Sequence, residues 1–135
     1  MASTSNPSVI GAPVGKYSHL VEAPADHRTI HISGQVGTLP DGSLAGPDVA
    51  TQTRQIFANI GELLASLGAG PGDLVKLTSF VSGVSCLPGY FRARDEVYAE
   101  WFAEGDYPAH SLAVVQALAK PELAVEIEGI VAIPA

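Results

Sequence analysis

An amphipathic helix set between turn residues is the feature that most constrains the fold of this 135-residue chain. Asp48 suits the N-cap, and Gly68 suits the stop because glycine readily takes the left-handed conformation that ends helices. Between them the apolar residues recur every three or four positions, at Ile56, Phe57, Ile60, Leu63, Leu64 and Leu67. The pattern predicts a helix with one face buried against another layer of structure.

Strand and helix patterns alternate on both sides of this helix. RTIHISGQVG (28–37) and GDLVKLTSFVSG (72–83) are rich in β-branched residues and stop at glycine, which predicts strands. YFRARDEVYAEWF (90–102) predicts a second amphipathic helix. Its expected buried side consists of Phe91, Val97, Tyr98, Trp101 and Phe102.

Two apolar strands close the chain, HSLAVVQALA (110–119) and ELAVEIEGIVAIP (122–134), separated by a turn. At the other end, Ser, Pro and Gly dominate residues 1–15, and we expect order to begin near KYSHLVEA, which pairs in a hairpin with the strand at 28–37. We assign residues 1–10 to a flexible N-terminal lead-in and residues 11–135 to a single domain.

The predicted order β-β-α-β-α-β-β indicates an α+β domain in which both helices pack on one face of a mixed sheet. The closing strands are apolar on both faces, and a two-layer domain of this size has no second helical layer to cover the other face. The simplest way to bury this second face is against another copy of the chain, so we expect a homo-oligomer.

Composition and charge narrow the function classes. The net charge is −7 with only seven Lys and Arg residues, which argues against binding to nucleic acid or to an anionic membrane and leaves small molecules or proteins as partners. Cys86 is the only cysteine, so an intramolecular disulfide and a four-thiolate metal site are both excluded. With no signal-like or membrane-spanning segment, we expect a cytoplasmic location.

Glu126 and Glu128 share one face of the last predicted strand, opposite Val125 and Ile127. A carboxylate held among apolar groups can exchange a proton near neutral pH, which makes Glu126 a candidate general acid or base. The alternative is a solvent-facing edge or an ion pair between subunits.

His110, in the segment YPAHS (107–111), allows three interpretations: a buried spacer, a ligand-holding cation or a proton shuttle. A hairpin-like return of the closing strands would bring it opposite Glu126. His27 and His31 are spaced to share a strand face, but no third ligand is evident nearby, so we expect no metal site.

Several segments together resemble one family. ISGQVG, QTRQIFANIGELLASLGAGPGDLVKLTSFV, FRARDEVYAEWF, YPAHS and VEIEGIVAI occur in the order typical of the reactive intermediate deaminases, the RidA or YjgF family, also labelled L-PSP endoribonuclease. The resemblance spans residues 11–133. It implies a chorismate-mutase-like α+β subunit in a homotrimer, with a cleft between subunits that hydrolyses small imines and enamines without a cofactor.

The resemblance also assigns residues to the cleft. Glu126 matches the glutamate that orients the attacking water, Tyr17 in GKYSHL matches a cleft tyrosine, and Gly34 in SGQ matches a backbone contact to the substrate. Ser111, the last residue of YPAHS, falls in the same substrate-binding region.

Two positions depart from the family pattern. His110 stands where the family has the arginine that grips the substrate carboxylate, and Asp95 stands where the second helix usually has asparagine. Loss of a bidentate arginine contact costs about 2–4 kcal/mol of carboxylate binding. We therefore expect a divergent deaminase that uses Glu126, with His110 as a proton shuttle, on an imine or enamine that need not carry a carboxylate. The alternative is a protein that binds or senses a small molecule without turnover.

Overall fold

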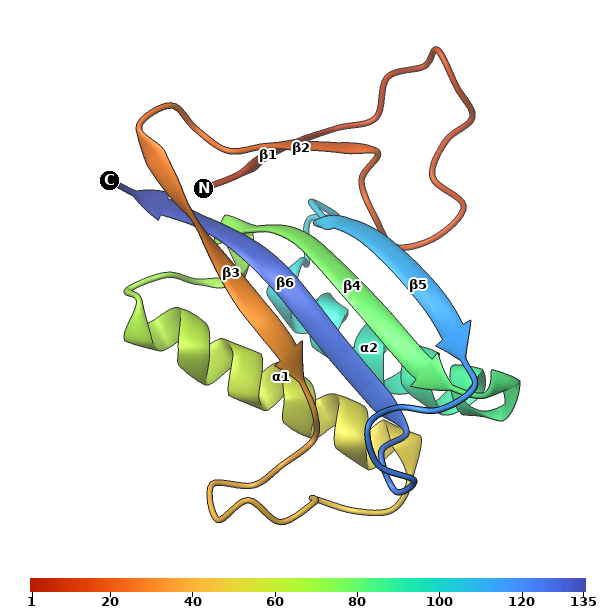
Figure 1. Cartoon of the computed structure of the whole chain (residues 1–135). Coiled ribbons are helices and arrows are strands. Elements are labelled where there is room, and N and C mark those ends of the chain that lie inside the picture. The colour runs from red at the N-terminus through yellow and green to blue at the C-terminus, as the bar shows by residue number, and fades with distance from the viewer.

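Four strands form the main sheet of the computed structural model, which describes residues 1–135 (Figure 1). In spatial order they are β3 (His27–Gln35), β6 (Val125–Pro134), β4 (Leu74–Ser82) and β5 (Ala109–Val115). β4 and β5 run parallel, and the other neighbours are antiparallel. The helices α1 (Val49–Ser66) and α2 (Leu87–Trp101) lie on the same face of this sheet (Figure 1), which confirms the predicted α+β class.

Helix α1 begins and ends where its sequence predicts. The Asp48 carboxylate accepts a hydrogen bond of 2.9 Å from the Thr51 backbone N–H. At the other end Gly68 has a φ of 68°, and its N–H and that of Ala69 donate to the carbonyls of Ala65 and Leu64. These paired bonds form a Schellman motif, which satisfies carbonyls that the helix itself leaves unpaired.

The core lies between the helices and the face of the sheet that they cover. Alternation along the strands directs every second residue toward the helices, so buried and partly exposed positions alternate along β4. The fully buried apolar residues are Ile56, Phe57, Ile60, Leu64, Leu77, Val81, Tyr90, Tyr98, Val125, Ile127 and Val131. Leu63, expected in the core, is 39% exposed because it sits on the outer flank of α1.

The buried side of α2 differs from the expectation. Tyr98 and Phe102 are buried as predicted, but Phe91 is 36% exposed. The buried residues of this helix also include Tyr90, Ala93 and Arg94, and the helix begins at Leu87, three residues before the segment predicted from the sequence.

Both hairpins predicted from the sequence are wrong. The short strand β2 (Leu20–Glu22) pairs with β1 (Ser3–Ser5), within the segment assigned to the lead-in, and β3 pairs with β6. β5 pairs in parallel with β4, and β4 lies between β5 and β6. Adjacency in the sequence suggested these hairpins, whereas every pairing in the main sheet joins strands that are separated by at least one helix.

The face of the sheet opposite the helices, called here the open face, carries alternate residues of β4 from Lys76 onward and of β6 from Glu126 to Ile130. It includes Lys76, Thr78, Phe80, Glu126, Glu128 and Ile130. No element of the chain is stacked on this face (Figure 1), and the prediction of a homotrimer that covers it stays a prediction.

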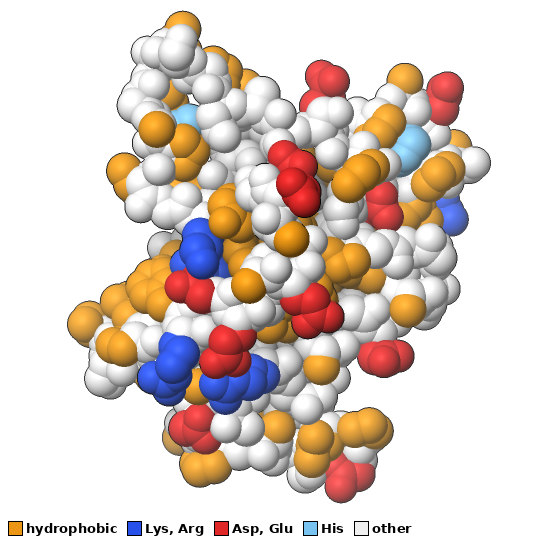
Figure 2. Space-filling view, turned by 180° about the vertical axis from the view of Figure 1, so that it is seen from behind, with side chains coloured by type: hydrophobic (Ala, Val, Ile, Leu, Met, Phe, Trp, Pro, Cys, Tyr) orange, Lys and Arg blue, Asp and Glu red, His pale blue; other side chains and the backbone are white.

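Figure 2 views the molecule from behind and shows Lys and Arg side chains interspersed with Asp and Glu side chains. The ion pair of Arg54 with Glu96 joins the two helices with a nitrogen to oxygen distance of 2.8 Å. No helix in the chain combines the length and the apolar character needed to cross a membrane.

Candidate functional site

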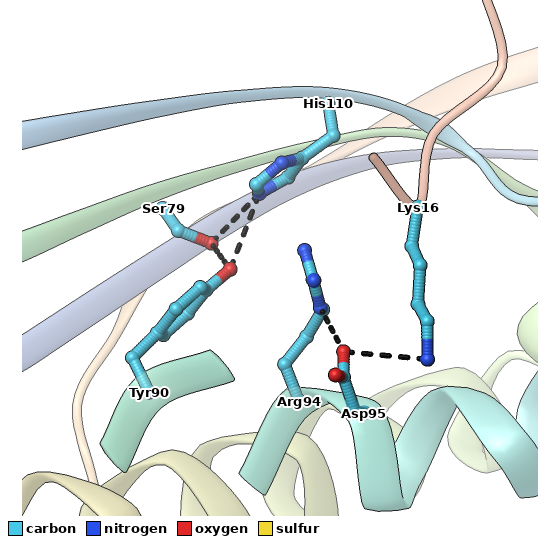
Figure 3. Close-up of polar contacts among 6 residues, drawn as sticks. All are labelled: Lys16, Ser79, Tyr90, Arg94, Asp95 and His110. Carbon is cyan, nitrogen blue, oxygen red and sulfur yellow. Dashed lines mark hydrogen bonds and ion pairs between the residues drawn. The ribbon is translucent and has the colours of Figure 1, made fainter. Parts of the chain in front are cut away.

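His110 points from β5 toward the helices. It is paired in register with Leu77, a core residue of β4, which fixes the face of the sheet on which its ring lies. Its Nε2 atom is 3.0 Å from Ser79 Oγ and 3.3 Å from the Tyr90 hydroxyl, and the Tyr90 hydroxyl donates to Ser79 Oγ over 2.7 Å (Figure 3). A chain in which Tyr90 donates to Ser79 and Ser79 donates to Nε2 satisfies all three groups and assigns the ring proton to Nδ1.

The pKa of His110 is lowered to about 4, first by burial and then by the positive charges of Arg94 and Lys76. The ring is therefore neutral at physiological pH. Of the three interpretations of this histidine, a positively charged ligand holder is the one that this environment disfavours most strongly.

Acidification is expected to destabilise the protein through His110. The unfolded chain protonates this ring below about pH 6.5, whereas the folded chain does so only near pH 4. The unfolded state therefore binds more protons between these limits, and the stabilisation present above pH 6.5 is lost as the pH falls toward 4.

Between pH 7.5 and pH 5 the loss of unfolding free energy attributable to His110 is about 2 kcal/mol. Urea unfolding at the two pH values checks this, with His110→Gln expected to lack that part of the loss and His31→Gln, on an exposed residue of β3, expected to keep it. An NMR titration of the His110 ring with a midpoint near 6.5 would contradict the prediction.

An ion-pair cluster lies beside His110 (Figure 3). Arg94 Nε donates to Asp95 Oδ1 over 3.0 Å, and Lys16 Nζ lies 3.5 Å from the same oxygen. Arg94 and Lys16 line a cavity of about 340 Å³ between the segment 14–17, helix α2 and strand β5. The residues that line it include Lys16, Tyr17, Phe91, Arg94, His110 and Leu112.

Gly34 and Glu126 meet on the open face. A β-bulge interrupts the pairing of β3 with β6 between Ile32 and Gln35, and the bulge brings the Gly34 backbone against the Glu126 side chain. A Cβ atom at Gly34 would lie 2.8 Å from Glu126 Cδ, closer than a real contact allows. A side chain at position 34 would therefore force the Glu126 carboxylate to move from this position, where it makes no hydrogen bond or ion pair within the chain.

Ser111 lies on the same open face, where its Oγ accepts a hydrogen bond of 3.1 Å from Lys76 Nζ. On β4 it is paired with Thr78, and Thr78 is paired on its other side with Glu128 of β6. Ser111 is exposed and shares no contact with His110, although the two are adjacent in the sequence, because successive residues of a strand point to opposite faces.

The structure thus divides the predicted residues into two groups. Tyr17, Asp95 and His110 lie together on the helix side, while Gly34, Ser111 and Glu126 lie on the open face. The hairpin expected to bring His110 opposite Glu126 does not form, since β4 separates their strands.

Arg94 is the residue of this region that the sequence analysis missed. It is only 7% exposed, and its guanidinium lies near the rings of Phe91, Tyr98 and Tyr90. The signal that would have found it is its spacing, four residues after Tyr90 and four before Tyr98, which places all three on one face of α2.

A different cavity, of about 290 Å³, lies near the N-terminus and is lined by Met1, Trp101, Glu104 and Asp106 among others. None of the predicted site residues borders it, and no Lys or Arg side chain does. We therefore place the candidate site at the cavity beside His110.

Comparisons with known proteins point to one family. The model of the family described as Endoribonuclease L-PSP matches residues 9–133. The chain is 35% identical over 120 residues to the 2-iminobutanoate/2-iminopropanoate deaminase of Mus musculus, covering 88% of this chain and 82% of that protein. It is 34% identical to a RutC family protein of Pyrococcus horikoshii, covering 87% of each.

Solved structures agree with this match. The chain superposes on YyfB of Yersinia pestis, a Rid-family protein of unknown function, with a TM-score of 0.85, 36% identity and 98% of both chains covered. It superposes on the Escherichia coli YjgF protein with a TM-score of 0.68 and 29% identity, covering 95% of this chain and 96% of that one.

Proposed function

Because the chain belongs to the Endoribonuclease L-PSP family, which includes the RidA and YjgF proteins, we propose that it hydrolyses a small imine or enamine to a carbonyl compound and ammonia. The observation that carries this proposal is the unpaired Glu126 carboxylate, which lies against the Gly34 backbone on the open face of a chain about one third identical to proteins named 2-iminobutanoate/2-iminopropanoate deaminase. Family membership supports the reaction type, and Glu126 supplies the carboxylate that accepts a proton from the attacking water.

In the proposed reaction water adds to the carbon of the C=N bond. The Glu126 carboxylate accepts a proton from this water as the new C–O bond forms, and the nitrogen is protonated to give a carbinolamine. Collapse of the carbinolamine breaks the C–N bond and releases ammonia and the carbonyl compound. The balance requires one water and no redox partner, so we propose no cofactor.

The proposed site is completed between subunits. Within one chain the sheet separates Glu126 from the cavity beside His110, because the two side chains lie on opposite faces and on strands that β4 keeps apart. A homotrimer in which the open face of one subunit meets the β5 edge of the next would bring the two groups together. Tyr17 and Asp95 then belong to the substrate-binding side of the cleft and Glu126 to the water-activating side.

The ribonuclease activity in the family's name is not part of this proposal. The net charge of −7 is unfavourable for a polyanionic substrate, and the residues that line the cavity include only two cations, Lys16 and Arg94. A protein that binds a small molecule without turnover is the alternative, and the assay below separates it from an enzyme.

We expect the protein to accelerate the decay of 2-iminopropanoate generated in place by a pyridoxal-phosphate dehydratase that forms 2-aminoacrylate. The measurement is the rate of imine loss against protein concentration, with boiled protein as the control. Light scattering on the same sample should give the mass of a trimer. A monomer at micromolar concentration would rule out the intersubunit site, and an unchanged decay rate would favour a binding protein or another imine.

A further inference from the structure

We propose that the guanidinium of Arg94 binds the carboxylate of the substrate, so that helix α2 supplies the cationic contact that His110 does not. This inference rests on the proposed function for the identity of the reaction, but the anion site itself can be tested without turnover. It assigns the protein to imines that carry a carboxylate next to the C=N carbon, that is, to 2-imino acids.

Arg94 lines the cavity and is held there by contacts with its neighbours. Its residue exposure is 7%, and its Cζ atom lies 5.0 Å from the ring centre of Phe91 and 5.3 Å from that of Tyr98. The neighbouring rings of Tyr90, Phe91 and Tyr98 and the bond from Nε to Asp95 restrict the orientation of the guanidinium. A group fixed in this way loses little conformational entropy when it binds a ligand.

The terminal nitrogens of Arg94 remain available. Nε is paired with Asp95, no Nη atom makes an ion pair, and the further polar contact of this side chain is with the Tyr90 hydroxyl, whose pKa is raised by burial, an effect that Arg94 opposes. Arg94 lines the cavity, and none of its nitrogens is among the fully enclosed side-chain atoms that lack a partner. Figure 3 shows the guanidinium projecting from α2 toward the strand that carries His110.

The charges around the cavity favour a singly charged anion. Lys16 and Arg94 contribute two positive charges, Asp95 contributes one negative charge, and His110 is neutral at physiological pH. One positive charge is therefore left over. A planar carboxylate matches both this charge and the fork of the two Nη atoms, with which it can form two parallel hydrogen bonds.

The test compares two probes that differ only in charge, 2-oxobutanoate and its amide, by calorimetric titration of the assembled protein. The wild type is expected to bind the carboxylate more tightly than the amide. Arg94→Gln should weaken carboxylate binding by about 30-fold or more while changing amide binding less than about threefold. Arg92→Gln, on an exposed residue of the same helix, is the matched control and should change neither.

A merely structural Arg94 would alter the binding of both probes equally, and that result would overturn the inference. So would equal binding of carboxylate and amide by the wild type, or binding of neither. If Arg94→Gln fails to fold, the ¹⁵N resonances of the Arg94 side chain in the wild type decide, since they should shift on addition of 2-oxobutanoate and not of the amide.

Turnover is read separately. An inactive protein that binds 2-oxobutanoate through Arg94 would contradict the deaminase proposal and support this inference. An active protein in which Arg94→Gln leaves the KM for 2-iminopropanoate unchanged would support the deaminase proposal and contradict this inference.

Discussion

Replacement of Glu126 by Gln is expected to lower kcat for imine hydrolysis by about 10²- to 10⁴-fold, the usual contribution of a positioned general base. Gln has the size and hydrogen-bonding reach of Glu but cannot accept the proton of the attacking water. Its contact with the Gly34 backbone should persist, because the amide fills the same space. Binding of 2-oxobutanoate should stay within about threefold of the wild type, since the carboxylate of this probe does not require the base.

Glu128→Gln is the matched control for this variant. Glu128 lies two residues further along β6 on the same open face, but it is exposed and paired across from Thr78, away from Gly34. The same chemical change at this position should leave kcat and KM unaltered. Equal losses in both variants, or full activity in Glu126→Gln, would remove Glu126 from the proposed mechanism.

Replacement of Gln52 by Leu is expected to lower the free energy of unfolding by about 2–4 kcal/mol. Gln52 is fully buried in α1, where its Nε2 donates to the Gly46 and Glu122 carbonyls over 3.0 and 3.1 Å. Its Oε1 accepts a bond of 2.9 Å from the Ala124 N–H. Leu fits the space but leaves these backbone groups without a partner.

Gln55→Leu provides the comparison, since the same change three residues along α1 removes only a side-chain bond to Asn59. Its expected cost is below about 1 kcal/mol. Urea unfolding of both variants at one fixed protein concentration measures the difference. Equal stabilities would show that the bonds of Gln52 to the segment before β6 contribute little.

Local patterns sufficed for much of the fold. The caps at Asp48 and Gly68 bracket α1 because capping depends on residues within one turn of the helix end. Alternation likewise separated Glu126 and Glu128 from the buried Val125 and Ile127, since a strand has a fixed period of two.

The predicted site residues are a mixed case. The family resemblance predicted Tyr17, Asp95 and His110 as site residues. Tyr17 and His110 line one cavity, and Asp95 is paired with Lys16 beside it. Gly34 and Glu126 also meet. No local pattern indicated that the two sets lie on opposite faces of the sheet, because that depends on which strand is inserted between β5 and β6.

By itself the sequence determined the two helices, the four strands of the main sheet, the caps of α1 and the face on which each side chain of these strands lies, because these follow from contacts between residues close in the chain. Only the tertiary structure decided the strand order and the environment of Arg94. The guanidinium of Arg94 contacts aromatic rings of α2 and Asp95, and it lines a cavity whose other walls are β5 and the segment 14–17. The neutral state of His110 was decided in the same way, since burial and the field of Arg94 and Lys76 arise only when distant segments pack together.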